Sequence, residues 1–141
     1  IDDYYNPYTG VRRYMDEVPE QAREKGYVTS MLGRRRYVPT IGDRNYNVRL
    51  RAEREAINMP IQGSASDIVK IAMLKVEEAL RREKLKAQII MQVHDELLLE
   101  APADEVERVI PIVKKEMEEA VRLDVPLTVE IGAGDNWMNT K

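Results

Sequence analysis

The stretch IIMQVHDELLLE, residues 89–100, constrains the fold of this chain more than any other. Two apolar runs of strand length flank a polar triplet, His94, Asp95 and Glu96. Short apolar runs separated by a few polar residues are typical of two largely buried strands joined by a tight turn. The sequence therefore predicts a β-hairpin that carries its ionisable side chains at the turn.

The chemistry of this turn follows from the cost of burying charge. An unpaired ionised carboxylate is costly in apolar surroundings, so Asp95 and Glu96 must be exposed or face a cation. Neighbouring side chains of a strand point to opposite faces, so we expect only one of the two to be a close metal ligand. Asp95 suits magnesium, which takes one or two protein carboxylates and completes its shell with waters and phosphates. A plain turn that is polar because it is exposed fits the spacing equally well.

The rest of the sequence predicts a turn near Pro7 and, after it, mainly helices. Apolar residues recur at helical spacing in four segments: 10–25, 48–59, 64–83 and 104–122. Gly26 and Pro60 are expected to end the first two helices. Ser64 or Ser66 is expected to cap the third, and Asp104 the fourth. Pro111, inside the fourth, predicts a kink or a late helix start, because an interior proline costs about 3 kcal/mol.

Two further segments predict strands. Residues 26–39 indicate a short hairpin with Arg34, Arg35 and Arg36 beside its turn, where either structural ion pairs or phosphates could offset their repulsion. Alternation over 127–131 predicts a last strand beside the central hairpin. The expected fold class is α+β: a small antiparallel sheet backed by helices 64–83 and 104–122, with a helical N-terminal portion.

Charge is distributed unevenly along the chain. The net charge of -3 argues against nucleic-acid binding, yet residues 23–54 carry nine basic against three acidic side chains, whereas residues 95–141 carry five against twelve. A basic front could meet phosphate while an acidic back faces solvent or another domain. A solvated charged face explains the basic stretch as well.

Composition narrows the class of protein. No apolar run approaches the roughly 18 residues needed to cross a bilayer, so no membrane partner is expected. Cysteine is absent, which excludes disulfides and thiolate metal sites and fits a cytoplasmic location. The opening IDDYYNPYTG has neither Met nor a signal peptide, so we expect a fragment of a larger protein.

The polar residues around Pro60 allow two interpretations. Asn58 and Gln62 are four apart, and amides both donate and accept hydrogen bonds, which suits the minor-groove acceptors that all base pairs share. Capping and loop bonding are the blander roles for the same two amides.

Three segments together resemble one known family. QVHDELLLE at 92–100 resembles the third catalytic motif of the family A DNA polymerases, the DNA polymerase I type. REAINMPIQGSASDIVKIAM at 54–73 resembles the block that precedes that motif, and GYVTSMLGRRRYVP at 26–39 resembles the stretch before it. The order and spacing match the family, and the similarity covers essentially the whole chain.

The resemblance implies a fold and an activity. Residues 1–60 would be the C-terminal part of the fingers subdomain and residues 61–141 the C-terminal part of the palm. The activity would be DNA-directed DNA polymerisation, a template-dependent nucleotidyl transfer that serves replication and repair. Its partners would be primer-template DNA, deoxynucleoside triphosphates and the remainder of the polymerase chain.

The resemblance also implies residue roles. Asp95 would bind one Mg²⁺ of a two-metal site, and Glu96 and His94 would join it as catalytic residues. Arg54, Asn58 and Gln62 would touch primer-template DNA, with His94 near the primer terminus. The family's other essential Asp lies in an upstream segment that this sequence lacks, so the chain alone is expected not to polymerise.

Two alternatives remain open at this point. One is a non-catalytic nucleic-acid-binding module from a split or decayed polymerase, which would tolerate loss of Asp95. The other is a two-metal nuclease, which would require further acids in motif-like settings.

Overall fold

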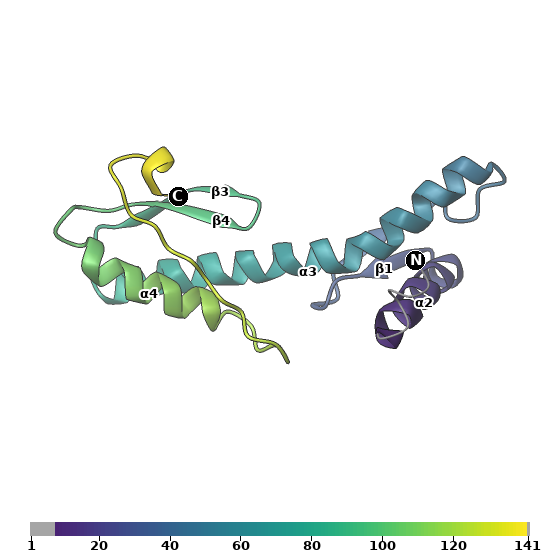
Figure 1. Cartoon of the computed structure of the whole chain (residues 1–141), viewed down its shortest axis with the longest axis horizontal. Coiled ribbons are helices and arrows are strands. Elements are labelled where there is room, and N and C mark those ends of the chain that lie inside the picture. Colours follow the sequence, from purple (N-terminus) through teal and green to yellow (C-terminus); the bar gives the residue numbers. More distant parts are fainter. Residues whose placement is uncertain (1–7, 141) are drawn as a thin grey trace. The chain divides into compact units, whose positions relative to one another are not determined.

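The computed structural model describes residues 8–140, so the turn expected near Pro7 lies outside the described residues. The chain divides into two compact units, the first ending at Ala65 and the second beginning at Ser66. Each unit has its own hydrophobic core. Helix α3 (Tyr46–Arg82) contributes residues to both units (Figure 1).

Helix α2 (Thr9–Lys25) confirms the expected N-terminal helix and its stop signal. Gly26 has a φ of 77°, the left-handed conformation that glycine adopts without steric cost. Its backbone N–H donates to the carbonyl of Ala22 at 2.8 Å, which closes the last turn.

The predicted N-terminal hairpin is also confirmed. Strands β1 (Tyr27–Thr29) and β2 (Arg35–Tyr37) pair antiparallel, and α2 lies beside β1 (Figure 1). Gly33, with a φ of 82°, donates its N–H to the carbonyl of Ser30 within the turn. The core of the first unit collects buried side chains from α2, this hairpin, the loop after it and α3: Val18, Ala22, Val28, Val38, Ile41, Ala52 and Ala56.

Helix α3 corrects the predicted break at Pro60. The sequence predicts two helices, 48–59 and 64–83, whereas a single helix of 37 residues runs through Pro60. Proline removes one intrahelical hydrogen bond, so a helix continues through it only where surrounding contacts compensate. Ser64 is therefore not an N-cap: its hydroxyl donates to the carbonyl of Pro60, one turn earlier in the same helix.

Contacts from the rest of the first unit surround this proline turn. The N–H of Met31 donates to the Ser64 hydroxyl at 2.8 Å, and the guanidinium of Arg34 donates to the carbonyl of Gly63 at 3.0 Å. The hydroxyl of Tyr14 donates to the carbonyl of Ile57 at 2.8 Å. These bonds anchor α2 and the turn of the β1–β2 hairpin to the helix on both sides of Pro60, which accounts for its continuity.

The second unit is a hairpin backed by two helices, as the α+β prediction requires. Strands β3 (Gln88–Val93) and β4 (Glu96–Glu100) pair antiparallel, with a bulge between Ile89 and Met91. Ile89 and Leu99 pack against a core drawn from α3, α4 (Val106–Glu118) and the residue just before β3: Val76, Leu80, Ala87, Val109 and Val113.

Helix α4 differs from its prediction at both ends. It begins at Val106 and ends at Glu118, so Asp104 is not its cap and Arg122 lies beyond it. The Glu105 carboxylate is instead used in tertiary bonding, since it accepts the N–H groups of Lys86 at 2.8 Å and Ala87 at 3.2 Å. Pro111 stands inside the helix, so the helix does not start late.

The strand expected at residues 127–131 is wrong. The segment keeps the alternating burial of a strand, but both sheets found within residues 8–140 are two-stranded and neither includes it. A strand needs backbone partners as well as alternating side chains. Here Val129 donates its N–H to the Glu118 carboxylate at 3.0 Å. The chain then reaches a short 3₁₀-helix, η1 (Trp137–Thr140).

Candidate catalytic hairpin and nucleic-acid interface

The ionisable triplet stands at the tip of the β3–β4 hairpin. The last cross-strand pair joins Val93 to Glu96, which leaves His94 and Asp95 as the turn. His94 has a φ of 55°, an uncommon conformation outside glycine in which histidine is relatively enriched. The side-chain amide of Gln92 donates to the carbonyl of His94 at 3.0 Å and so stabilises the turn.

All three side chains of the triplet are exposed. This confirms the expectation that Asp95 and Glu96 are exposed to solvent. Along β4, Glu96 and Leu98 alternate with Leu97 and Leu99, and Leu99 packs against the core. Glu96 therefore lies on the face of β4 opposite to that of Leu99.

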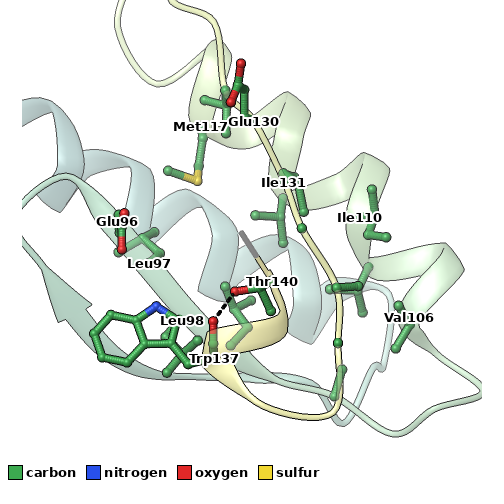
Figure 2. A pocket seen from close by; sticks show the side chains of 18 of the residues that line it. Glu96, Leu97, Leu98, Val106, Ile110, Met117, Glu130, Ile131, Trp137 and Thr140 are labelled. Atoms are coloured by element: carbon green, nitrogen blue, oxygen red, sulfur yellow. Dashed lines mark hydrogen bonds between the residues drawn. The ribbon is translucent and has the colours of Figure 1, made fainter.

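A cavity of about 470 Å³ adjoins this turn, between the hairpin, α4 and the C-terminal segment (Figure 2). Both Asp95 and Glu96 line it, whereas most of the remaining lining is apolar. Trp137 also contributes, on the 3₁₀-helix that the Thr140 hydroxyl closes by donating to the Trp137 carbonyl at 2.8 Å. With Glu130 of the C-terminal segment, the cavity places three carboxylate-bearing residues at one water-accessible space.

The donor chemistry of the turn fits a partial magnesium site. Within residues 8–140 no three His, Cys, Asp or Glu side chains are grouped closely enough to hold a metal ion. Asp95 and Glu96 nevertheless offer hard carboxylate oxygens in an exposed position. Magnesium takes one or two protein carboxylates and leaves its other positions to waters or substrate phosphates.

The second group of predicted site residues forms a row on α3. Arg54, Asn58 and Gln62 are exposed and follow one another at intervals of four. Such positions on a continuous helix differ by only about 40° around the axis, so the row spans roughly 12 Å along one side. The uninterrupted helix through Pro60 thus brings Gln62 onto the same face as Arg54 and Asn58.

The opposite side of α3 is buried against the first unit. Ala52 and Ala56 are in the core, and Gly63 is buried beside Ser30 and Met59. A Cβ on Gly63 would lie 3.0 Å from the Met59 methyl carbon, so glycine permits close packing here. The exposed row is therefore positioned by the packing of the buried face on the other side of the same helix.

The sequence gives no direct sign of two groups that position these sites. Arg34 is predicted only as one of three arginines beside a turn, yet it bonds to the carbonyl of Gly63 in α3. Glu105 is predicted as part of a helix, yet it holds the backbone where the chain enters β3. Gly63 could have signalled this contact, because a glycine inside a helix favours close approach of another segment, but the break expected at Pro60 left Gly63 between two predicted helices.

The chain belongs to the family of DNA polymerases called DNA polymerase family A. The sequence model of that family matches residues 1–139. The expectation drawn from the three motif-like segments is confirmed.

Known proteins agree with this assignment. DNA polymerase I of Geobacillus stearothermophilus is 51% identical over 141 residues, and that of Bacillus subtilis is 47% identical over the same length. The alignment covers the whole of this chain but 16% of each relative's length. A solved structure, the POL domain of Pol1 from M. smegmatis in complex with DNA primer-template and dNTP, superposes with a TM-score of 0.93 at 45% identity. That match covers 97% of this chain and 24% of the other.

None of the helices described in residues 8–140 is both long and apolar enough to cross a membrane.

Proposed function

We propose that this chain forms part of a DNA-directed DNA polymerase, in which it contributes one catalytic carboxylate and contacts primer-template DNA. The observation that carries this proposal is the exposed turn of His94 and Asp95 between paired strands in a family A chain. Residues 1–60 would belong to the fingers subdomain and residues 61–141 to the palm. The division of the chain into two compact units after Ala65 supports such a partition.

Asp95 would hold a Mg²⁺ ion, with Glu96 beside it in a positioning role. When bound, divalent metal in this class of site activates the attacking hydroxyl and neutralises the leaving pyrophosphate. The exposure of Asp95 allows its carboxylate to face metal and substrate together. His94, on the same turn, would contact the primer near its 3′ end.

The row on α3 would contact the primer-template duplex. Arg54 supplies a fixed positive charge for a phosphate, and the amides of Asn58 and Gln62 can donate to the acceptors that all base pairs present in the minor groove. Such contacts position a duplex without demanding a particular sequence, as a polymerase requires. The excess of basic over acidic residues within 23–54 supports contact between this stretch of the chain and DNA phosphates.

A chimera tests the proposal directly. This chain would replace the corresponding residues of the Geobacillus stearothermophilus enzyme, which aligns with it over 141 residues. We expect the chimera to extend a primer with Mg²⁺ and deoxynucleoside triphosphates. The 141-residue chain alone should not do so, because the family resemblance implies a second essential Asp outside it.

The matched control is Asp104→Asn, the same change at an exposed aspartate in the loop before α4. Asp95→Asn should abolish extension in the chimera while Asp104→Asn leaves it intact. A folded chimera whose extension survives Asp95→Asn would contradict the catalytic assignment and favour a non-catalytic nucleic-acid-binding module.

A further inference from the structure

The β1–β2 hairpin has a face that the roles proposed above leave unused. Its register sets Tyr27 opposite Tyr37 and Thr29 opposite Arg35. Strand alternation puts these four residues on one face, and Val28, on the other face, is buried in the core. We call the face of Tyr27, Thr29, Arg35 and Tyr37 the hairpin platform.

Contacts within the hairpin platform fix its aromatic rings. The rings of Tyr27 and Tyr37 meet edge to face, with centroids 5.8 Å apart and an interplanar angle of 67°. The guanidinium carbon of Arg35 lies 4.7 Å from the centroid of the Tyr27 ring, a cation–π distance. Tyr37 remains 65% exposed. The platform therefore offers solvent an ordered aromatic ring beside a cation.

Charge narrows the kind of partner that would fit. Residues 27–38 carry three arginines, Arg34, Arg35 and Arg36, and no acidic residue. Phosphate is attracted to such a surface, and unpaired bases stack on exposed aromatic rings whatever their sequence. Bases within a duplex are already stacked on one another. An aromatic and cationic surface therefore favours an unpaired strand over a duplex.

We propose that the hairpin platform binds the unpaired part of a template strand, with a base stacked on Tyr37 and Arg35 beside the neighbouring phosphate. The inference rests on the proposed polymerase function and adds a surface separate from the row on α3. Its ligand differs too, since that row is proposed to contact duplex DNA.

Two single-stranded ligands test the stacking step. Fluorescence anisotropy would measure binding of the whole chain to a labelled deoxythymidine oligomer of about 12 nucleotides, within the range that single-strand modules cover. An abasic oligomer of the same length supplies the phosphates without the bases. We expect Tyr37→Ala to weaken binding of the deoxythymidine oligomer roughly five- to a hundredfold and to leave binding of the abasic oligomer unchanged.

Further variants separate stacking from folding. Tyr37→Trp should retain or strengthen binding, because it keeps an aromatic face, whereas Tyr37→Leu keeps apolar bulk and should bind as weakly as Tyr37→Ala. The matched control is Tyr46→Ala. Tyr46 is 64% exposed and has the guanidinium carbon of Arg49 at 5.6 Å from its ring centroid, yet it lies outside the hairpin. Its replacement should leave binding unchanged.

The inference would be overturned if Tyr37→Ala bound the deoxythymidine oligomer as tightly as the original chain. It would also be overturned if Tyr37→Ala lost as much affinity for the abasic oligomer as for the deoxythymidine oligomer, or if Tyr46→Ala lost as much affinity for the deoxythymidine oligomer as Tyr37→Ala. Each can occur while the chimera still extends primers, so failure of the hairpin platform is distinguishable from failure of the proposed function. Loss of primer extension in an otherwise folded chimera would count against the proposed polymerase function.

Discussion

The two hairpins of this chain share an architecture and differ in nearly everything that decides what they bind. The β1–β2 hairpin carries three arginines and no acid within residues 27–38. The β3–β4 hairpin has Asp95 and Glu96 at its tip and no basic residue within residues 88–100 apart from His94. One hairpin suits an anionic ligand and the other a cation.

Both hairpins pack on the core of their own unit, through Val28 in β1–β2 and through Ile89 and Leu99 in β3–β4, but the turn of β1–β2 is in addition bonded to a helix. The turn of β1–β2 is tied to α3 by polar bonds, from Met31 to Ser64 and from Arg34 to Gly63. The β3–β4 hairpin is anchored by apolar packing of Ile89 and Leu99 on the core of its unit. Polar bonds are directional and fix the turn of β1–β2, whereas apolar packing at the base of β3–β4 leaves its polar tip available for chemistry.

The largest effect should come from the acidic tip. In the chimera, Asp95→Asn removes the charge that would offset a metal cation while it keeps the side-chain shape, so we expect kcat to fall by at least about 10²-fold. Affinity for primer-template should be unchanged or tighter, because a negative charge near phosphate is lost. Single-turnover extension and anisotropy on the same preparation would separate the two quantities.

Glu96→Gln tests whether Asp95 or Glu96 is the metal ligand at the tip. Glu96 begins β4 and pairs with Val93, whereas Asp95 belongs to the turn. We expect Glu96→Gln to reduce kcat less than Asp95→Asn does. The opposite order in single-turnover assays would make Glu96 the metal ligand and invalidate our choice between two residues that line the same cavity.

The next largest effect should come from the exposed row on α3. Arg54→Ala, Asn58→Ala and Gln62→Ala combined should weaken primer-template binding at least about tenfold. Affinity should fall with salt by about 0.9 log units per log of salt for each phosphate neutralised, and this slope should shrink when Arg54 is lost. Arg81→Ala, an exposed arginine of α3 in the other unit, serves as the control. Salt-independent binding would contradict the phosphate contacts proposed for the basic stretch of residues 23–54.

How far sequence predicts this molecule depends on whether a local signal decides the outcome. Gly26 ends α2 because a left-handed residue closes a helix by itself, and the tip at His94 and Asp95 follows from local polarity between apolar runs. The family motifs likewise identify the chain without reference to tertiary contacts.

The errors arise where distant residues override local signals. Pro60 is a strong helix breaker, yet α3 continues because Met31, Arg34 and Tyr14 bond to the turns around it. Residues 127–131 have the alternation of a strand but lack a backbone partner within the described sheets. Backbone pairing and compensation of a proline are tertiary properties, so no local pattern reveals them.

A smaller effect should follow from loosening the polar anchor. Ser64→Ala removes the acceptor for the N–H of Met31 and the donor to the carbonyl of Pro60. We expect a loss of about 1 kcal/mol in the free energy of unfolding, measured by urea denaturation, because the turn of β1–β2 is exposed and water can replace part of the bonding. Ser66→Ala, two residues further along the same helix, is the control. An equal loss in both variants would mean that the anchor to the hairpin contributes nothing.

The smallest effect concerns Tyr14, whose hydroxyl donates to the carbonyl of Ile57 beside the proline turn. Burial raises the pKa of Tyr14 above its ordinary value of 10.0, because the ionised form loses hydration. The unfolded chain therefore releases this proton first as the pH rises. The stability that Tyr14 contributes is fully present below pH 10.0 and declines as the pH increases through the higher pKa of the folded state.

Tyr14→Phe isolates this contribution. At neutral pH the variant should lose about 1 kcal/mol of unfolding free energy through the missing hydrogen bond, and above pH 10.0 its deficit relative to the original chain should narrow. Urea denaturation across pH 8 to 11 would measure both quantities, with Tyr37→Phe as the control at an exposed tyrosine. A deficit that stays constant over this range would show that ionisation of the Tyr14 hydroxyl is not linked to folding, and the absence of any deficit at neutral pH would show that Tyr14 acts only through packing. The first unit would then rely on one polar anchor fewer, and its contrast with the apolar anchoring of β3–β4 would weaken accordingly.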